Sequence, residues 1–324
     1  MSLPTFTSTT TAEEVAAVFA NQIKGKNVLI TGTSIGGIGF EAARVIAKYA
    51  PNLLILASYS PERLKLSEDE IKKETPHANI RLLTVDLSSL ASVRRAAAEV
   101  NAYAEPLHVL IHNAAGGLGP FKLTEDKFES QMATDHLGPF LFTKLVLPKL
   151  LAAGSTSYTP RVVFVSSAAE AFGTPIDFDA MEHPTAEKCS FGDSYNWAKS
   201  ANILTATELS RRAQGKINAY SLHPGGIFTN IQQREESKDW FIAAGILTPD
   251  GKPNPAKFEW KTIPQGAATT VAASFDTRLD DQPGAYLWDG MAANDKISAN
   301  STDPAKAATL WALTEKLIGE KFEL

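Results

Sequence analysis

The stretch TGTSIGGIG, residues 31–39, decides the fold expected of this chain. It follows the apolar run NVLI and precedes FEAARVIAKYA, in which apolar residues recur at helical spacing. Backbone amides at the start of a helix attract a phosphate, and glycine lets the phosphate come close. The stretch therefore predicts a dinucleotide-binding loop between a buried strand and a helix, with a purely structural turn as the alternative.

Strand-like and helix-like segments alternate along the rest of the chain. Short apolar runs predict strands at residues 27–32, 52–58, 79–87, 107–114, 161–167, 216–224 and 284–290. Helical patterns follow the loop to about residue 49, begin again at residue 61, and cover residues 88–102, 125–151, 195–214 and 304–319. We therefore expect an α/β fold, a single Rossmann-type doubly wound parallel sheet of about seven strands in the order 3-2-1-4-5-6-7, with helices on both faces.

No linker or repeat divides the chain, so we predict a single dinucleotide-binding domain over residues 1–324. A helix over residues 11–23 is expected to pack outside the main sheet. The least regular part, residues 226–264, follows the carboxyl end of a strand, where ligands bind in such sheets. We interpret it as a substrate lid, with core packing of its aromatic residues as the alternative. These aromatic residues are Trp240, Phe241, Phe258 and Trp260.

Composition and charge narrow the class of protein. The net charge is −5 and basic residues form only short pairs, so nucleic acid is not an expected partner. The N-terminal segment lacks a basic start and a long apolar core, so neither a signal peptide nor a membrane span is expected. The single cysteine, Cys189, predicts a loop thiol in a reducing, cytoplasmic setting. His108 and His112 share a strand without a carboxylate partner, so no metal is expected.

The spacing of the glycines points to a particular family. Gly32 is followed by four residues and then by Gly37-Ile38-Gly39. This differs from G-x-G-x-x-G and resembles T-G-x-x-x-G-x-G, the loop of the short-chain dehydrogenase/reductase family, with one residue inserted at the tip of the turn. The loop form with a second glycine pair resembles a subgroup related to retinol dehydrogenases and common in fungi.

The resemblance covers roughly residues 26–221, with weaker traces after them. Further motifs stand in the family's order, each at an expected strand end or helix: TVDLSS, HNAAGG, RVVFVSSAAE, YNWAK and LHPGGIFTN. The resemblance implies cofactor contacts from Gly32, Thr33, Ser34, Gly37, Ile38, Gly39, Tyr59, Arg63, Asp86, Leu87, Asn113, Ala114, Ala115, Tyr195, Lys199, Pro224, Gly225, Ile227 and Thr229. For Asp86, the alternative is a helix N-cap or a loop carboxylate.

The same resemblance implies catalytic roles for Ser167, Tyr195 and Lys199. Hydride transfer to a carbonyl builds negative charge on oxygen, so a proton donor and a hydrogen-bond donor must lie beside that oxygen. Tyr195 is the expected acid/base, and Lys199, four residues along the same helix face, is expected to favour its phenolate. Ser167 is expected to hydrogen-bond the substrate oxygen. A nicotinamide cofactor supplies the hydride.

One catalytic position departs from the family. The segment TDHLGPF places Asp135 where the family has an asparagine that holds a water in a proton relay. An ionised aspartate accepts hydrogen bonds but cannot donate them. It is expected either to order a water or to pair with Lys199 and raise the pKa of that lysine. Two consequences of Asp135 are left open. The position has changed during evolution and the activity is retained, or the redox chemistry is altered or lost.

Cofactor choice depends on the segment after the second strand. NADP-preferring relatives often have arginine where this chain has Tyr59, and NAD enzymes have an acid nearby, whereas none occurs here before Glu62. Arg63 is a candidate for the 2′-phosphate, with a solvent-facing role as the alternative. We therefore expect NADP rather than NAD.

The expected function is that of an NADP-dependent carbonyl reductase or alcohol dehydrogenase. Its expected substrate is a small molecule, a bulky and apolar ketone or alcohol of specialised metabolism. The alternatives are an NADP(H)-binding enzyme that catalyses an isomerisation or cyclisation, and a non-catalytic cofactor sensor. The resemblance also implies a homodimer or homotetramer that pairs through the helices at residues 125–151 and 195–214, unless the last helix blocks or extends that pairing.

Overall fold

The computed structural model describes residues 3–116, 119–257 and 259–324. Within them, one sheet contains eight strands in the order β10-β9-β6-β5-β4-β1-β2-β3. The strands are β1 (Asn27–Thr31), β2 (Leu53–Ser58), β3 (Ile80–Thr84), β4 (Val109–His112), β5 (Arg161–Val165), β6 (Asn218–His223), β9 (Tyr286–Trp288) and β10 (Met291–Ala292). The α/β fold and the predicted order of the first seven strands are confirmed. The short edge strand β10, antiparallel to β9, was not expected.

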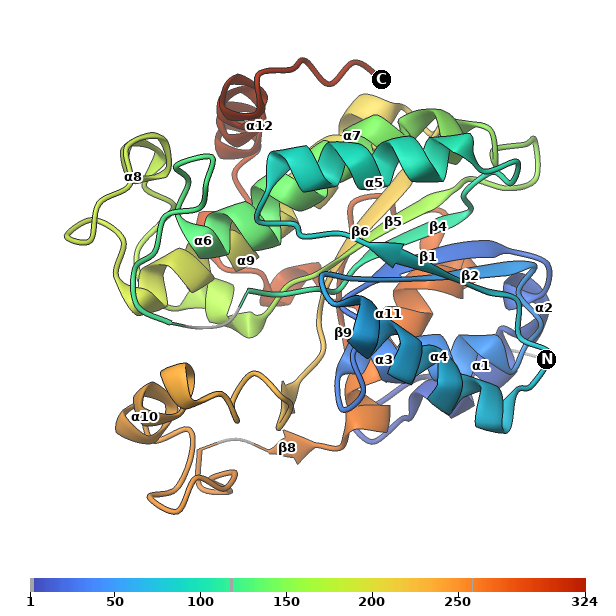
Figure 1. Ribbon diagram of the computed structural model, residues 1–324, viewed down its shortest axis with the longest axis horizontal. Coiled ribbons are helices and arrows are strands. Elements are labelled where there is room, and N and C mark those ends of the chain that lie inside the picture. The colour runs from blue at the N-terminus through green and yellow to red at the C-terminus, as the bar shows by residue number, and fades with distance from the viewer. Residues whose placement is uncertain (1–2, 117–118, 258) are drawn as a thin grey trace.

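Helices cover both faces of the sheet (Figure 1). One face carries α1 (Ala12–Val18), α3 (Ile38–Ala47), α4 (Pro61–Glu74) and α11 (Ile263–Phe275). The other face carries α5 (Leu90–Ala102), α7 (Gly138–Leu151), α9 (Phe191–Ala213) and α12 (Pro304–Ile318). None of the helices in the described ranges is both long and apolar enough to cross a membrane.

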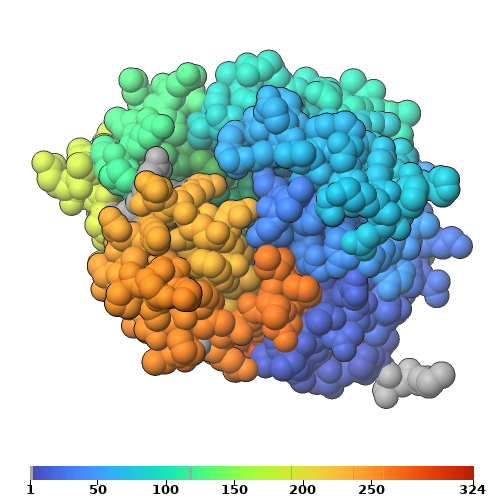
Figure 2. Space-filling view, turned by 60° about the horizontal axis from the view of Figure 1, so that its bottom comes forward, coloured from blue at the N-terminus to red at the C-terminus, as the bar shows by residue number. Residues whose placement is uncertain are grey.

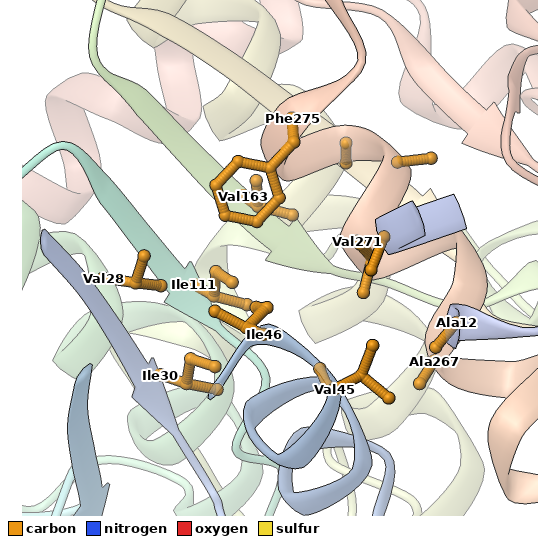
Figure 3. Packing of buried hydrophobic residues seen from close by; sticks show 14 of the residues in the cluster. Ala12, Val28, Ile30, Val45, Ile46, Ile111, Val163, Ala267, Val271 and Phe275 are labelled. Carbon is orange, nitrogen blue, oxygen red and sulfur yellow. The ribbon is translucent and has the colours of Figure 1, made fainter. Parts of the chain in front are cut away.

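The central strands are buried along their whole length because helices cover them on both sides. Figure 3 shows how the first face is filled: strand residues point toward branched and aromatic side chains of two helices. The strands β1, β4 and β5 contribute Val28, Ile30, Ile111 and Val163, and the helices contribute Val45, Ile46, Val271 and Phe275. This packing fixes the carboxyl ends of the strands, from which the candidate site is built.

The N-terminal segment 11–23 forms two helices, α1 and α2 (Ala20–Ile23), which meet at Phe19. Thr11 and Glu14 form a capping box in which each side chain accepts a hydrogen bond from the other residue's backbone amide. α1 packs against α11. Phe19 is buried and meets Phe6 edge-to-face at a centroid distance of 6.1 Å.

The prediction of one continuous helix over residues 125–151 was wrong in two respects: the helical segment begins later, and it is not α-helical throughout. Helix α6 (Ser130–Met132) begins only after Glu129, whose carboxylate accepts hydrogen bonds from the amides of Gln131 and Met132. The next five residues, Ala133–Leu137, are wound as a π-helix, and the amide of Gly138 bonds the carbonyl of Ala133. Such π turns are frequent at functional sites. This one carries Asp135.

Two other predicted boundaries shift because of capping side chains. Helix α9 starts at Phe191, four residues before the prediction, because Ser190 caps it by accepting from the amide of Asp193. Ser89 caps α5 by accepting from the amide of Ser92, so this helix begins at Leu90, two residues after the predicted start at residue 88.

The remaining short elements lie in the connections. They are η2 (Ala168–Ala171), α8 (Phe178–Glu182), β7 (Gly226–Ile227), α10 (Glu235–Ala243), β8 (Trp260–Lys261), η3 (Thr277–Leu279), η4 (Asn294–Lys296) and η5 (Ala299–Ser301). β7 and β8 pair in parallel and close the base of the segment predicted as a lid. Helix α10 lies at the outer end of that segment (Figure 1).

Candidate active site

The glycine loop joins β1 to α3, as its sequence predicts. Gly37 is the N-cap of α3, and no side chain of the described residues caps that helix end. The first amides of α3 are therefore available to an anionic ligand. Thr33 is fully buried, and its hydroxyl oxygen has no hydrogen-bond partner in the part of the chain that the structure describes. Both features fit a loop that holds a phosphate group.

Two of the glycines are required by close packing against the end of β4. Gly32 has φ +75°, and a Cβ there would lie 2.6 Å from the Cα of Ala114. A Cβ on Gly39 would lie 2.7 Å from the carbonyl oxygen of Gly32. The side-chain amide of Asn113 donates to the carbonyl oxygens of Thr31 and Gly32, at 3.0 and 3.1 Å. The HNAAGG turn thus fixes the loop from behind, although Gly117 of this motif lies outside the described residues.

The tip of the loop, where the extra residue falls, contacts the segment predicted as a lid. The side-chain amide of Asn230 donates to the carbonyl of Ile35 at 2.8 Å. Gly36 has φ +81°, and a Cβ there would lie 3.1 Å from the side-chain oxygen of Asn230. In Figure 2 the gold and orange lid segment adjoins the blue first part of the chain. The longer loop therefore meets Asn230 directly.

The three predicted catalytic residues come from β5 and α9, which pack against each other. Ser167 follows the carboxyl end of β5 and caps η2, where its hydroxyl accepts from the amide of Ala169. The neighbouring Ser166 donates to the carbonyl of Lys199 at 2.6 Å, which ties this strand end to α9. Tyr195 is half-buried, and the Lys199 ammonium lies 5.3 Å from the centre of its ring. The strand end that precedes Ser167 therefore packs against the helix that carries Tyr195 and Lys199.

Lys199 forms a buried ion pair with Asp135. Its ammonium lies 3.0 Å from one carboxylate oxygen of Asp135, and both side chains are almost fully buried, at 3% and 1% exposed. The other carboxylate oxygen accepts from the amide of Gly116 at 2.5 Å. Burial is the largest single influence and acts to lower the pKa of Lys199, but the interactions with Asp135 and Tyr195 together outweigh it, so the pKa is raised. Of the two arrangements expected for Asp135, the structure has the ion pair.

A third contact completes the surroundings of Lys199. The ammonium donates to the carbonyl of Val165, the last residue of β5, at 3.3 Å. An ammonium has three hydrogens. One therefore remains for a further acceptor after Asp135 and Val165.

Of the residues expected near the adenine, Asp86, Tyr59 and Arg63 are exposed. Asp86 accepts from the amide and hydroxyl of Ser88, as a loop carboxylate does. Tyr59 is 56% exposed, and the Arg63 guanidinium lies 5.5 Å from its ring centre. Leu87 is buried, with its carbonyl against Gly138. The surroundings of Asp86 match the alternative role, although they leave a contact with adenine open.

The turn after β6 places the remaining cofactor candidates. Pro224 and Gly225 lead into β7, where Ile227 packs against Gly266 of α11. The amide and hydroxyl of Thr229 both donate to the side-chain oxygen of Gln232. This places the turn between the end of β6 and the lid segment.

The lid segment packs on the candidate catalytic residues. Phe241 and Leu247 form a small apolar cluster with Tyr195 and other residues of the segment. The aromatic residues of the predicted lid differ in burial: Phe241 is buried in this cluster, whereas Trp240 is 36% exposed. Trp260 donates to the carbonyl of Asn254 and belongs to the same cluster. Phe258 lies outside the described residues.

The histidines noted in the sequence are held by the sheet. His112 is buried beside the hydroxyl of Thr143 at 2.7 Å, and burial lowers the pKa of His112 to about 3. His108 accepts from the amide of Asn27 at 3.0 Å. The described ranges contain no group of three His, Cys, Asp or Glu side chains placed to hold a metal. Cys189 is buried, which raises the pKa of its thiol.

Sequence reasoning missed several residues that the fold brings to this site. Asn230 was quoted only as the end of the LHPGGIFTN motif, and Arg234, which lines a cavity together with Arg63, was not considered. Gly116 and Val165, which contact Asp135 and Lys199, act through backbone atoms that any residue has. Asn230, Gly116 and Val165 all stood in quoted motifs, whereas no motif included Arg234.

Comparison with known proteins agrees with this arrangement. A model of short chain dehydrogenases matches residues 26–177. The short-chain dehydrogenase TIC 32 A, chloroplastic, of Brassica napus is 35% identical over 318 residues, which cover 96% of this chain and 93% of that protein. The human WW domain-containing oxidoreductase is 31% identical over 324 residues, which cover 98% of this chain and 73% of that protein.

Solved structures show the same fold. An uncharacterised protein from Mycobacterium paratuberculosis has a TM-score of 0.69 and 27% identity, over 93% of this chain and 96% of that one. An Escherichia coli short chain dehydrogenase complexed with NADPH has a TM-score of 0.61 and 21% identity, over 83% of this chain and 98% of that one. The match along nearly the whole chain agrees with the motifs and the sheet order, and the protein belongs to the short-chain dehydrogenase/reductase family, as an oxidoreductase enzyme.

Proposed function

We propose that this protein is an NADP-dependent oxidoreductase that transfers a hydride between nicotinamide and a bulky, apolar ketone or alcohol. The observation that carries the proposal is that Ser167, at the end of β5, precedes a turn that packs against α9, the helix of Tyr195 and Lys199, on the same edge of the sheet as the uncapped glycine loop. We extend the proposal to a cytoplasmic location and a role in specialised metabolism, which the sequence suggests.

The residues present fit a dinucleotide. The first turn of α3 offers free amides to a diphosphate, and the buried hydroxyl of Thr33 lacks a partner among the described residues. The remaining hydrogen of Lys199 suits a ribose hydroxyl. When bound, the nicotinamide accepts or donates the hydride.

The protein's own groups would handle the proton. In the reductive direction, the carbonyl oxygen accepts a hydrogen bond from Ser167 and takes the phenol proton of Tyr195. In the oxidative direction, the phenolate of Tyr195 takes the proton of the alcohol. Positioning a donor where charge develops is worth several kcal/mol of barrier, about 3 kcal/mol for a single donor.

The preference for NADP is supported by a cavity beside the glycine loop. Ser34, Arg63, Asn230 and Arg234 are among its lining residues. Within the described ranges, neither guanidinium forms an ion pair or a hydrogen bond with an acidic side chain. Two unpaired positive charges facing one cavity repel each other and attract an anion. We propose that the cavity receives the 2′-phosphate, with Arg234 contributed by the lid segment.

Neutralising either arginine should weaken the binding of NADPH but not of NADH. Removing a charge-assisted bond to a phosphate costs about 1.5–3 kcal/mol, so Arg63→Gln or Arg234→Gln should raise the Kd for NADPH roughly tenfold or more. Nicotinamide fluorescence during titration of the purified protein measures both constants. Lys252→Gln is the control, since it removes a charge from an exposed lid lysine that does not line the cavity. Equal weakening of NADPH and NADH would contradict the phosphate assignment.

The lid segment suggests the nature of the substrate. Tyr195 adjoins apolar lid residues, with Phe228, Ile231 and Ile242 among those packed around Phe241 and Leu247. An apolar wall beside the reacting oxygen favours a substrate with bulky apolar groups. A panel of ketones and alcohols graded by size and polarity tests this choice.

The titration and the panel together decide between the proposed function and its alternatives. Tight NADPH binding with oxidation of the cofactor by a carbonyl would support the reductase. Tight binding with chemical conversion of a substrate but no change in nicotinamide absorbance would favour an isomerase or cyclase, which the replacement of the family asparagine by Asp135 suggests. Binding without any conversion would favour a cofactor sensor. Binding of neither cofactor would refute all three.

We expect the protein to be a monomer, because its own C-terminal helix packs on α7 and α9, the helices through which the family resemblance implies pairing. Trp311 of α12 meets Phe140 of α7 at a centroid distance of 4.7 Å, and Phe322 meets the same ring at 5.3 Å. Arg212 of α9 lies over Trp311. Light scattering after gel filtration should give the mass of one chain, 34.9 kDa. A mass of two or four chains would instead favour the homodimer or homotetramer implied by the family.

A further inference from the structure

The charge that should act on Tyr195 is cancelled inside the protein. A lysine beside a tyrosine stabilises the phenolate because the two carry opposite charges. Here the Lys199 ammonium lies 3.0 Å from Asp135, and water is excluded from both side chains. A pair of opposite charges at that separation exerts a much weaker field on a neighbouring group than a lone ammonium does. The neutral asparagine of the family would leave the ammonium uncancelled.

The surroundings of the pair hold Asp135 in place. Its second oxygen is bonded to the amide of Gly116, and its π-helical turn packs against α9. Lys199 is held by the carbonyl of Val165. Both partners are therefore fixed by backbone groups from other segments, so the carboxylate cannot move away from the ammonium without losing a hydrogen bond.

We propose that Asp135 is a positioning residue that moves the working range of this site to higher pH, because its carboxylate, 3.0 Å from the Lys199 ammonium, offsets the positive charge that this ammonium presents to the Tyr195 phenol. The inference rests on the proposed function for its kinetic consequence. It concerns a single proton: the O–H bond of Tyr195 breaks as the carbonyl oxygen takes the proton and the carbonyl carbon takes the hydride.

Other ionisable groups near the pair do not supply the missing charge. His136, next to Asp135, is buried against Thr314, and burial lowers its pKa to about 3. Burial also lowers the pKa of His223 on β6 to about 4, and its ring accepts from the amide of Ala168. The basic Lys261, which also acts on His223, is itself paired with Asp289.

The nearby carboxylates cannot supply the positive charge that Asp135 offsets at Lys199, because a carboxyl group is either neutral or negatively charged. Glu129, before α6, is buried, which raises its pKa, and it accepts backbone hydrogen bonds. Glu170, on η2, accepts from the amide and hydroxyl of Ser298 and from the hydroxyl of Ser301. Asp193, one turn before the site on α9, accepts from Ser190. The Asp135–Lys199 pair is therefore the arrangement that sets the local charge.

The test is the pH dependence of both reaction directions in Asp135→Asn. In the pH–rate profiles, the proton of Tyr195 controls the fall of carbonyl reduction at alkaline pH and the fall of alcohol oxidation at acid pH. Both of these limbs should therefore move to lower pH together in Asp135→Asn. An opposite charge within about 4–6 Å shifts a titration by roughly one to three pH units, and a shift of on the order of one unit or more is expected. A role in folding alone would lower activity without moving either limb.

Matched variants separate charge from structure. Asp135→Glu keeps the charge and should keep both limbs near those of the unmodified protein. Glu208→Gln removes another buried carboxylate of α9, one that pairs with Arg211 and Arg212, and should leave both limbs in place. If Asp135→Asn does not fold, Asp135→Ser removes the same charge and leaves room for a water. Limbs that coincide with those of the unmodified protein, or that move in opposite directions, would overturn the proposal.

A second measurement does not need a substrate. The difference in phenolate absorbance between the unmodified protein and Tyr195→Phe, followed with pH, reports the titration of Tyr195. Burial raises the pKa of Tyr220 to about 12 and also raises the pKa of Tyr103, Tyr158 and Tyr286, so these four add little signal at lower pH.

The same absorbance difference can be measured between Asp135→Asn and the double variant Asp135→Asn/Tyr195→Phe. The phenolate signal should then appear at lower pH than in the protein that retains Asp135. If it does while no carbonyl is reduced, the proposed function fails and the inference about the pair stands. If it does not move, the inference fails whatever the activity.

Discussion

Tyr195→Phe should lower kcat for hydride transfer by about 10²–10⁴-fold, the usual contribution of a positioned acid or base. The change removes only the phenol oxygen. The ring stays packed against Phe241 and Leu247 of the lid segment, and Lys199 keeps its bonds to Asp135 and Val165. The Kd for NADPH should therefore change far less than kcat, because any loss is limited to a contact of the phenol oxygen with the cofactor. Single-turnover kinetics with a carbonyl substrate, together with the fluorescence titration, separate these two effects.

The control for this prediction is Tyr103→Phe, which removes a phenol that bonds Glu99 away from the site. It should leave kcat unchanged. Full activity in Tyr195→Phe would mean that another group, or water, donates the proton. The assignment of the acid/base would then be wrong even though the fold and the cofactor loop are retained.

The second large effect is expected from Gly32→Ala, which should destabilise the protein and abolish tight cofactor binding. Two costs combine. A left-handed backbone conformation, φ +75°, costs an alanine about 1–2 kcal/mol. The added Cβ would also lie 2.6 Å from the Cα of Ala114 and 2.9 Å from its amide nitrogen, and such overpacking costs about 1–3 kcal/mol. The free energy of unfolding should fall by roughly 2–5 kcal/mol.

Gly25→Ala separates the two costs. Gly25 has nearly the same backbone conformation, φ +74°, but nothing lies within 4 Å of the position of its Cβ. It should lose only about 1–2 kcal/mol and bind NADPH normally. Denaturant unfolding gives both free energies. If the two variants behaved alike, close packing between Gly32 and Ala114 would not be what the loop requires.

The local features of this fold could be read from the sequence. The apolar run Val28–Ile30 before the glycine loop predicts a buried strand, because a strand in a covered parallel sheet contacts side chains on both faces. The alternation of strands and helices then restricts the order of strands, since parallel crossovers are right-handed and short. The seven predicted strands and their order were confirmed. The eighth, β10, has only two residues, too few to carry a pattern.

Helix boundaries were less certain because they depend on single capping contacts. The pattern in YNWAKSANILTATELS is helical, but the helix begins at Phe191 because Ser190 caps it. The π turn at Ala133–Leu137 was not predictable either. It coincides with Gly138, whose lack of a Cβ lets the carbonyl of Leu87 approach, and that contact joins segments about fifty residues apart in sequence.

The sequence by itself determined the sheet, the glycine loop and the residue types of the candidate site, because each depends on neighbours within a few positions along the chain. The tertiary structure decided which charges meet. Asp135 and Lys199, Arg63 and Arg234, and Ile35 and Asn230 lie far apart in sequence and come together only when strand ends gather at one edge of the sheet. A motif fixes the kind of group and its place on an element. The charge that the group experiences depends on distance and burial, which arise only from packing.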